Sequence, residues 1–115
     1  MAWTLDARIP VVFLDGGAIP PGRPAAVVSE APPGPLPAGA VAGAAFEGGV
    51  TSHAAACACC QGRSPAAQAL DRLFQARARG ACAWFDRVAV TPEAADAVRA
   101  ALREDAVAAA RFRAA

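Results

Sequence analysis

The sequence predicts a small α/β fold with about three to five strands and two or three helices, arranged in three layers or in two. Three observations lead to this prediction. The near-continuous apolar run IPVVFLD, at residues 9–15, is typical of a strand buried on both faces of a sheet. Two later segments show helical periodicity, and each opens with a Ser-Pro or Thr-Pro pair. Shorter strand-like segments lie before and between these two.

The first half of the chain reads as strands joined by loops. GGAIPPGRP, at residues 16–24, is too rich in Gly and Pro for a regular helix. A second strand is predicted at 25–29 and a weaker third at 41–46, with a Pro/Gly-rich loop at 31–39 between them. Only nine residues separate the first two strands, and a parallel crossover needs roughly a dozen or more. We therefore expect these two strands to be antiparallel neighbours or not adjacent at all.

The second half is marked by helix caps. Ser64 and Pro65 predict a helix start, and Gly80 predicts its end. The residues expected on its inner face are Ala66, Leu70, Leu73, Phe74 and Arg77. A strand follows at 84–90, anchored by Phe85, Val88 and Val90. Thr91 is expected to cap a second helix over 91–105, and a last helical turn or two covers 106–113.

Composition limits the classes of function. The chain of 115 residues fits one α/β domain, 1–115. Its formal net charge is +1 with acids and bases interspersed, so no nucleic-acid partner is expected. No apolar stretch approaches the length of a membrane span, and the N-terminus lacks the pattern of a signal peptide. We therefore expect a cytoplasmic protein.

A Cys-rich loop at 53–63 is the most distinctive feature of the sequence. It contains Cys57, Cys59 and Cys60, whereas the rest of the chain has one cysteine, Cys82. Thiolates bind Zn²⁺ strongly, and a tetrahedral site needs four donors. The pattern predicts a metal site formed by Cys57, Cys59, Cys60 and His53. Zn²⁺ is the favoured ion, although Cu⁺ and iron–sulfur intermediates also prefer thiolates.

The fourth donor and the chemistry of the thiols stay open at this point. Besides His53, the fourth donor can be water, a partner protein or one of four further side chains: Asp15, Glu30, Glu47 and Cys82. The nearby helix start and Arg63 are expected to lower the pKa of the thiols, which also favours redox reactivity. A third interpretation is that the cysteines are small apolar fillers of an Ala-rich loop.

Several segments, taken in order, resemble the CobW-type metallochaperone GTPases. IPVVFLDG resembles the family's first strand, and RPAAVVSE its second. CACC matches its Cys-x-Cys-Cys motif, and the following segment RSPAAQALDRLFQARARG resembles its next helix. WFDRVAV resembles its Phe-Asp-Arg-Val strand, and ALREDAVAAARFR the segment after it. The resemblance implies a remnant of a P-loop GTPase-like sheet and a role in metal handling.

The departures from that family concern the nucleotide. The chain has no lysine and no asparagine, so it lacks both the phosphate-loop Gly-Lys-Ser/Thr ending and the Asn-Lys-x-Asp motif. We therefore expect a non-catalytic, zinc-binding pseudo-GTPase whose partners are a metal ion and either a CobW-type GTPase or a metal-recipient protein. The alternatives are a thiol-redox protein and a structural protein that forms a homodimer, or docks on a partner, through unpaired strand edges.

Overall fold

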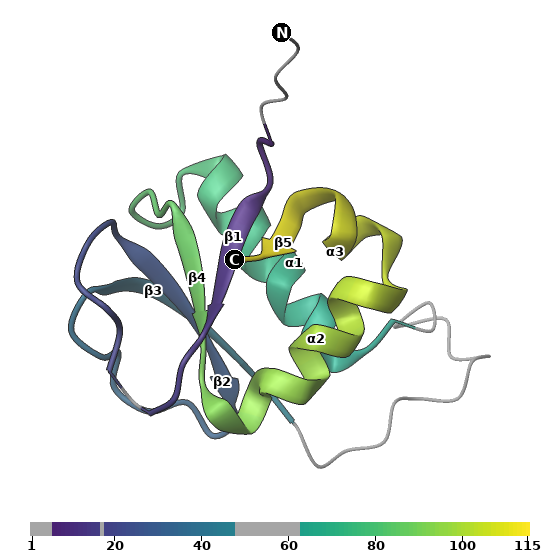
Figure 1. Ribbon diagram of the computed structural model, residues 1–115. Helices are drawn as coiled ribbons and strands as arrows, with labels where there is room; N and C mark the ends of the chain where they lie inside the picture. Colours follow the sequence, from purple (N-terminus) through teal and green to yellow (C-terminus); the bar gives the residue numbers. More distant parts are fainter. Residues whose placement is uncertain (1–5, 17, 48–62) are drawn as a thin grey trace, which may run out of the picture.

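The structure, a computed structural model, describes residues 6–16, 18–47 and 63–115 and confirms the predicted α/β fold (Figure 1). The strands are β1 (Ile9–Phe13), β2 (Ala25–Glu30), β3 (Ala40–Phe46), β4 (Arg87–Val90) and β5 (Phe112–Ala114). The helices are α1 (Pro65–Arg79), α2 (Ala95–Glu104) and α3 (Ala106–Arg111), with a 3₁₀ turn, η1 (Pro92–Ala94), before α2. None of the helices in these ranges is long and apolar enough to cross a membrane.

In the described ranges, five strands form one parallel sheet in the order β3-β2-β4-β1-β5. β4 lies between β1 and β2, pairing Val88 with Val11 on one side and with Ala26 on the other. The first two strands are therefore parallel but not adjacent, which is one of the two arrangements expected from their short connection.

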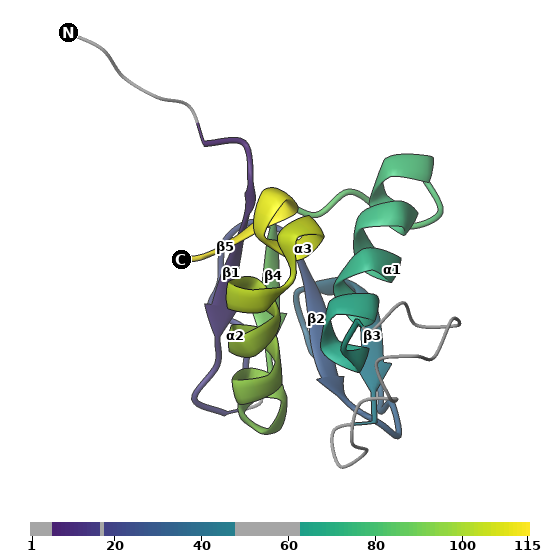
Figure 2. The same ribbon diagram turned by 90° about the vertical axis from the view of Figure 1, so that its right-hand side faces the viewer.

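The helices all cover the same face of the sheet. Figure 2 looks onto this layer, with α1 in front of β2 and β3 and with α2 and α3 in front of β1 and β4. Crossovers between parallel strands are right-handed. The links through α1 and through α2–α3 both run toward the β5 edge, whereas the links β1–β2 and β2–β3 run toward the β3 edge. Handedness therefore places the two non-helical links on the opposite face.

Loops rather than helices cover that opposite face, which makes this a two-layer fold. Ile19, from the β1–β2 link, packs there against Leu14, Val27 and Ala89. Arg87 fastens the same link, because its Nε donates to the Arg23 carbonyl at 2.9 Å and its Nη2 to the Pro20 carbonyl at 2.5 Å.

The link between β2 and β3 is a parallel crossover without a helix. Nine residues, 31–39, connect the end of β2 to the start of β3, and the segment contains four prolines. Nine extended residues reach about 30 Å, which is enough to return along a six-residue strand of about 20 Å. The crossover rule that we applied to β1 and β2 is therefore not obeyed by this pair.

The main core lies between the sheet and the helices. Leu70, Leu73, Phe85, Val98 and Phe112 are almost completely buried there. The inner face predicted for α1 is confirmed for Ala66, Leu70 and Leu73, while Phe74 and Arg77 are partly buried. Burying each large apolar side chain contributes about 1.5–3 kcal/mol, and most of the large buried side chains lie in this layer.

The ends of α1 follow the predicted capping. Ser64 Oγ accepts from the Ala67 amide at 3.2 Å, and Pro65 opens the helix. Gly80 ends it in the left-handed region, with φ of 71°. A residue with a Cβ is strained in that region, which explains why glycine follows the last helical residue.

Two predicted boundaries in the second half were wrong, and one cap was only partly as predicted. The strand at 84–90 begins only at Arg87, and Trp84 is 59% exposed. Thr91 stands at the predicted N-cap position before Pro92, but it opens the 3₁₀ turn η1 and its hydroxyl makes no capping hydrogen bond there. The chain end at 112–114 is a strand rather than helix, because pairing with β1 buries Phe112 at the sheet edge.

Candidate functional site at the carboxyl edge of the sheet

The carboxyl ends of the strands bring polar residues to one edge of the sheet. Glu47 follows β3, Glu30 ends β2, Thr91 follows β4 and Asp15 lies two residues after β1. The link that follows β4 runs over the helical face of the sheet. The links that follow its two neighbours, β1 and β2, run over the loop-covered face. Open α/β sheets bind ligands where neighbouring links diverge in this way. This edge is therefore the first place to look for a site.

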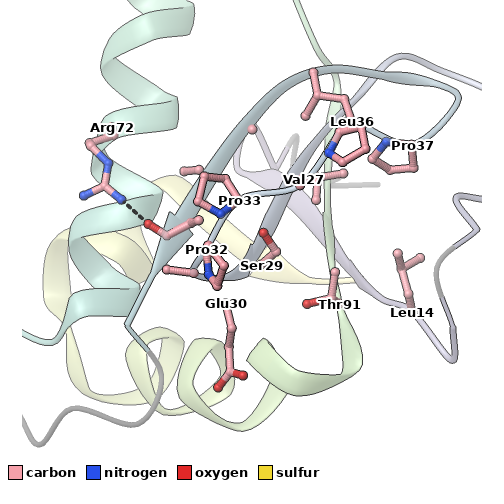
Figure 3. Close-up of a pocket in the computed structure, with 16 residues that line it drawn as sticks. Leu14, Val27, Ser29, Glu30, Pro32, Pro33, Leu36, Pro37, Arg72 and Thr91 are labelled. Atoms are coloured by element: carbon pink, nitrogen blue, oxygen red, sulfur yellow. Dashed lines mark hydrogen bonds between the residues drawn. The ribbon is translucent and has the colours of Figure 1, made fainter.

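A groove of about 750 Å³ opens at this edge, between the proline loop and the sheet (Figure 3). Leu14, Val27 and Leu36 contribute apolar walls, and Leu36 is itself 50% exposed. Gly43 allows the loop to lie close, since a Cβ at this position would lie 2.8 Å from Leu36 Cδ2. The groove is mostly apolar, with few polar groups.

Thr91 is one of those polar groups. Its backbone amide donates to the Val28 carbonyl at 3.1 Å, so the residue continues the hydrogen bonding of β4. Its Oγ1 is buried and has no hydrogen-bond partner among the residues that the structure describes. A buried hydroxyl without a partner costs about 1–3 kcal/mol, so this atom is ready to accept or donate to an incoming group.

Two charged residues border the groove but are directed differently. Arg72, on α1, donates from Nη2 to the Ala45 carbonyl at 2.8 Å (Figure 3). Glu30 extends its carboxylate away from the proline loop in the same view. Neither charged group therefore points into the groove. The guanidinium of Arg72 is bound to a backbone carbonyl, and the carboxylate of Glu30 lies beside the groove.

The predicted metal ligands Cys57, Cys59, Cys60 and His53 lie outside the described residues, as do most of the predicted Cys-rich loop residues. The described residues on either side of that part of the chain are Glu47, directly after β3, and Arg63, shortly before α1. α1 runs antiparallel to the strands that it joins, so it begins at their carboxyl edge.

The other candidate donors are spread along the sheet. Glu30 and Glu47 come from adjacent strands, whereas Asp15 follows β1, three strand positions from β3. At about 4.8 Å between strands, Asp15 and Glu47 are separated by roughly 14 Å and cannot hold one ion together. Within ranges 6–16, 18–47 and 63–115, no three His, Cys, Asp or Glu side chains cluster as metal ligands would.

Cys82 lies at the opposite end of α1. It follows Gly80 and is partly buried against the main core, as a free thiol. A helix of 15 residues is about 22 Å long, so Cys82 is separated from Arg63 by the length of α1. Its position suits core packing better than a share in a site at the carboxyl edge.

Arg63 is engaged in a network that the sequence analysis did not predict. Its guanidinium donates to both carboxylate oxygens of Asp71 and to both of Asp105, at 2.7 Å from Nε to Asp105 Oδ2. Asp105 also caps α3, accepting from the Val107 and Ala108 amides at 3.0 Å. The network thereby ties the start of α1 to the start of α3.

Charge compensation in this network changes the expectation for the thiols. The hydrogen bonds that Arg63 donates to Asp71, and then those that it donates to Asp105, raise the pKa of Arg63, and its bonds to Asp105 lower the pKa of that carboxyl group. Asp71 also lies 3.6 Å from Nη1 of Arg111, so two carboxylates face two guanidinium groups, and the positive charge of Arg63 is compensated. This compensation weakens the effect that we expected Arg63 to have on the pKa of nearby thiols, whereas the expected effect of the helix N-terminus is unchanged. The thiols themselves lie outside the described residues.

Sequence reasoning missed the Arg63 partners because they lie 8 and 42 residues away along the chain. The residues next to Arg63 indicated neither Asp71, on α1, nor Asp105, at the start of α3. Comparisons with models of protein families, with curated proteins and with solved structures found no match to this chain.

Proposed function

We propose that the protein binds a thiophilic metal ion, Zn²⁺ in the first place, through Cys57, Cys59 and Cys60, with His53 as a further ligand. The observation that carries this proposal is three thiols within four residues, in a chain with one other cysteine. Three thiolates and an imidazole are a donor set that suits tetrahedral Zn²⁺. In this proposal the protein binds a metal ion and does not catalyse a reaction.

The position of the flanking residues supports a site at the carboxyl edge. Cys60 is three residues from Arg63, and an extended chain of that length reaches only about 10 Å. Arg63 stands at the end of α1 that faces the carboxyl edge, where Glu30 and Glu47 supply carboxylates. Cys82 is about 22 Å away along α1, so we exclude it from the proposed ligand set.

The balanced charge of Arg63 favours the metal-binding proposal over thiol-redox chemistry. A reactive cysteine needs a lowered pKa, and a nearby unpaired cation is one of its usual causes. Asp71 and Asp105 occupy the guanidinium of Arg63 instead. A Zn²⁺ ion ionises its own thiol ligands and does not need that help.

The loss of GTPase activity is part of the same proposal. A phosphate loop needs a helix after the first strand and a lysine that reaches the phosphates. The described residues between β1 and β2 contain no helix, and the chain contains no lysine. As a CobW-like pseudo-GTPase, the protein would hold metal for a CobW-type GTPase or for a recipient protein.

Cobalt substitution tests the ligand set. Co²⁺ added to the reduced, metal-free protein should give the intense near-ultraviolet absorption of cobalt–thiolate bonds at one equivalent per chain. Each single change of Cys57, Cys59 or Cys60 to Ser should weaken that absorption, while Cys82→Ser should leave it unchanged. Equal spectra for all four variants, or no thiolate absorption in the unmodified protein, would contradict the proposed ligands.

A further inference from the structure

A second pocket, of about 450 Å³, lies between α2 and β5, the edge strand at the end of the sheet away from β3. Four arginines line it: Arg8, Arg99, Arg103 and Arg113. They come from the residue before β1, from two positions on α2 and from β5. The even mixture of charges in the sequence does not predict this concentration, because it arises only when the chain ends meet at one edge.

The positive charge of this arginine pocket is only partly balanced. Asp6 pairs with Arg8 at 2.8 Å and lies 3.5 Å from Nε of Arg113. Arg99 and Arg103 have no carboxylate within 4.0 Å among the described residues, which include every Asp and Glu of the chain. Four guanidinium groups thus face one carboxylate.

The hydrogen-bonding capacity is also unfilled. Nε of Arg113 is buried and has no hydrogen-bond partner among the described residues, although Asp6 Oδ2 lies 3.5 Å away. Arg99 and Arg103 are four residues apart on α2 and therefore share one face of it. Two like charges at this spacing destabilise a helix by about 0.2–0.5 kcal/mol. The Arg99 guanidinium also stacks on the Phe13 ring, 4.0 Å from its centroid, and such stacking leaves the in-plane N–H donors of Arg99 free for a ligand.

We propose that this pocket binds a small organic or inorganic polyanion through its guanidinium groups. Guanidinium forks match the paired oxygens of carboxylates and phosphates, and several forks in one pocket favour a ligand with several negative charges. Leu102 and Phe112 supply an apolar floor that can carry the body of such a ligand. This pocket lies on β5, away from the carboxyl ends of β2 and β4, and is independent of the proposed metal site.

Two probes and two double variants test this binding. The probes are pyrophosphate and citrate, which offer phosphate and carboxylate oxygens, titrated calorimetrically at low ionic strength. Arg99→Gln with Arg103→Gln should weaken binding of the preferred anion about tenfold or more. Arg23→Gln with Arg79→Gln removes the same charge from exposed positions outside the pocket and should leave the affinity unchanged.

The outcomes distinguish binding of the anion in this pocket from nonspecific attraction of anions to the positive charges of the protein. A loss confined to the α2 variant, together with a weaker affinity at higher salt, supports the pocket, and the better probe identifies the preferred oxygen chemistry. Equal loss in both double variants, or no binding of either anion, would overturn it. Binding of a single-stranded oligonucleotide but of neither small anion would also overturn it. Thermal melting of both variants checks that each remains folded.

Discussion

Arg63 shows how one residue serves local structure and long-range packing at once. It is the last residue of the Cys-rich loop at 53–63, yet its side chain is directed to Asp71 on α1 and to Asp105 at the start of α3. The side chains of Arg63 and Asp105 are 23% and 12% exposed, so water screens this pair less than a surface pair. The contacts of its guanidinium group are therefore those of a residue that anchors two helices to each other.

The acid dependence of stability should report this ion pair. Hydrogen bonds from Arg63 lower the folded-state pKa of Asp105 below its unfolded value of about 3.9. The stabilisation is therefore fully present above the unfolded pKa and is lost as pH falls through the lower, folded pKa. Asp105→Asn keeps a capping side chain but removes the charge, and at pH 7 it should lower the free energy of unfolding by about 1–2 kcal/mol.

Urea denaturation of the wild type and of Asp105→Asn between pH 7 and pH 2.5 measures this effect. The difference between the two proteins should stay constant down to about pH 5 and shrink below about pH 4. Glu104→Gln, an exposed neighbour, is the matched control and should show almost no difference. A difference for Asp105→Asn that persists undiminished at pH 2.5 would rule out this explanation.

At the scale of the element, α1 has the clearest local signals for its start and its end. Its two ends are set by Ser64 and Pro65 at the start and by Gly80 after the last helical residue. Its apolar side forms part of the main core. Because its first residue follows the Cys-rich segment so closely, the fixed start of α1 also limits where the proposed metal site can lie.

The C-terminal cap of α1 can be tested with two glycines. Gly80→Ala places a Cβ at φ of 71° and should lower the free energy of unfolding by about 1 kcal/mol. Gly34→Ala, in the proline loop, has an ordinary φ and open space around it, so it should be nearly neutral. Chemical denaturation compares the two, and equal stability of both variants would contradict the assignment of Gly80 as a left-handed cap.

Elements with local signals were predictable, whereas elements that depend on distant pairing were not. The caps of α1 and the apolar run of β1 could be read from neighbouring residues. β5 could not, because ARFR has no strand pattern of its own and becomes extended only by pairing with β1. The helix-free crossover of residues 31–39 was also missed as a parallel link, since the usual length rule assumes a helix in between.

At the scale of the whole molecule, the sheet has two unlike faces. In the part of the chain that the structure describes, three helices cover one face, and two Pro/Gly-rich links cover the other and leave the groove beside Thr91. Right-handed crossovers explain this division, because links that run in opposite directions across a sheet must use opposite faces. The cysteine motif could be found from sequence, but the groove and the arginine pocket combine residues from distant segments and required the fold.

The central claim is that Cys57, Cys59 and Cys60 bind metal, and metal content tests it most directly. The protein, purified under reducing conditions without a metal-binding tag and offered zinc, would be analysed by inductively coupled plasma mass spectrometry beside the triple Ser variant and Cys82→Ser. We predict about one zinc per chain in the unmodified protein and in Cys82→Ser, and none in the triple variant. Equal zinc in the triple variant, or no zinc in the unmodified protein, would contradict the claim.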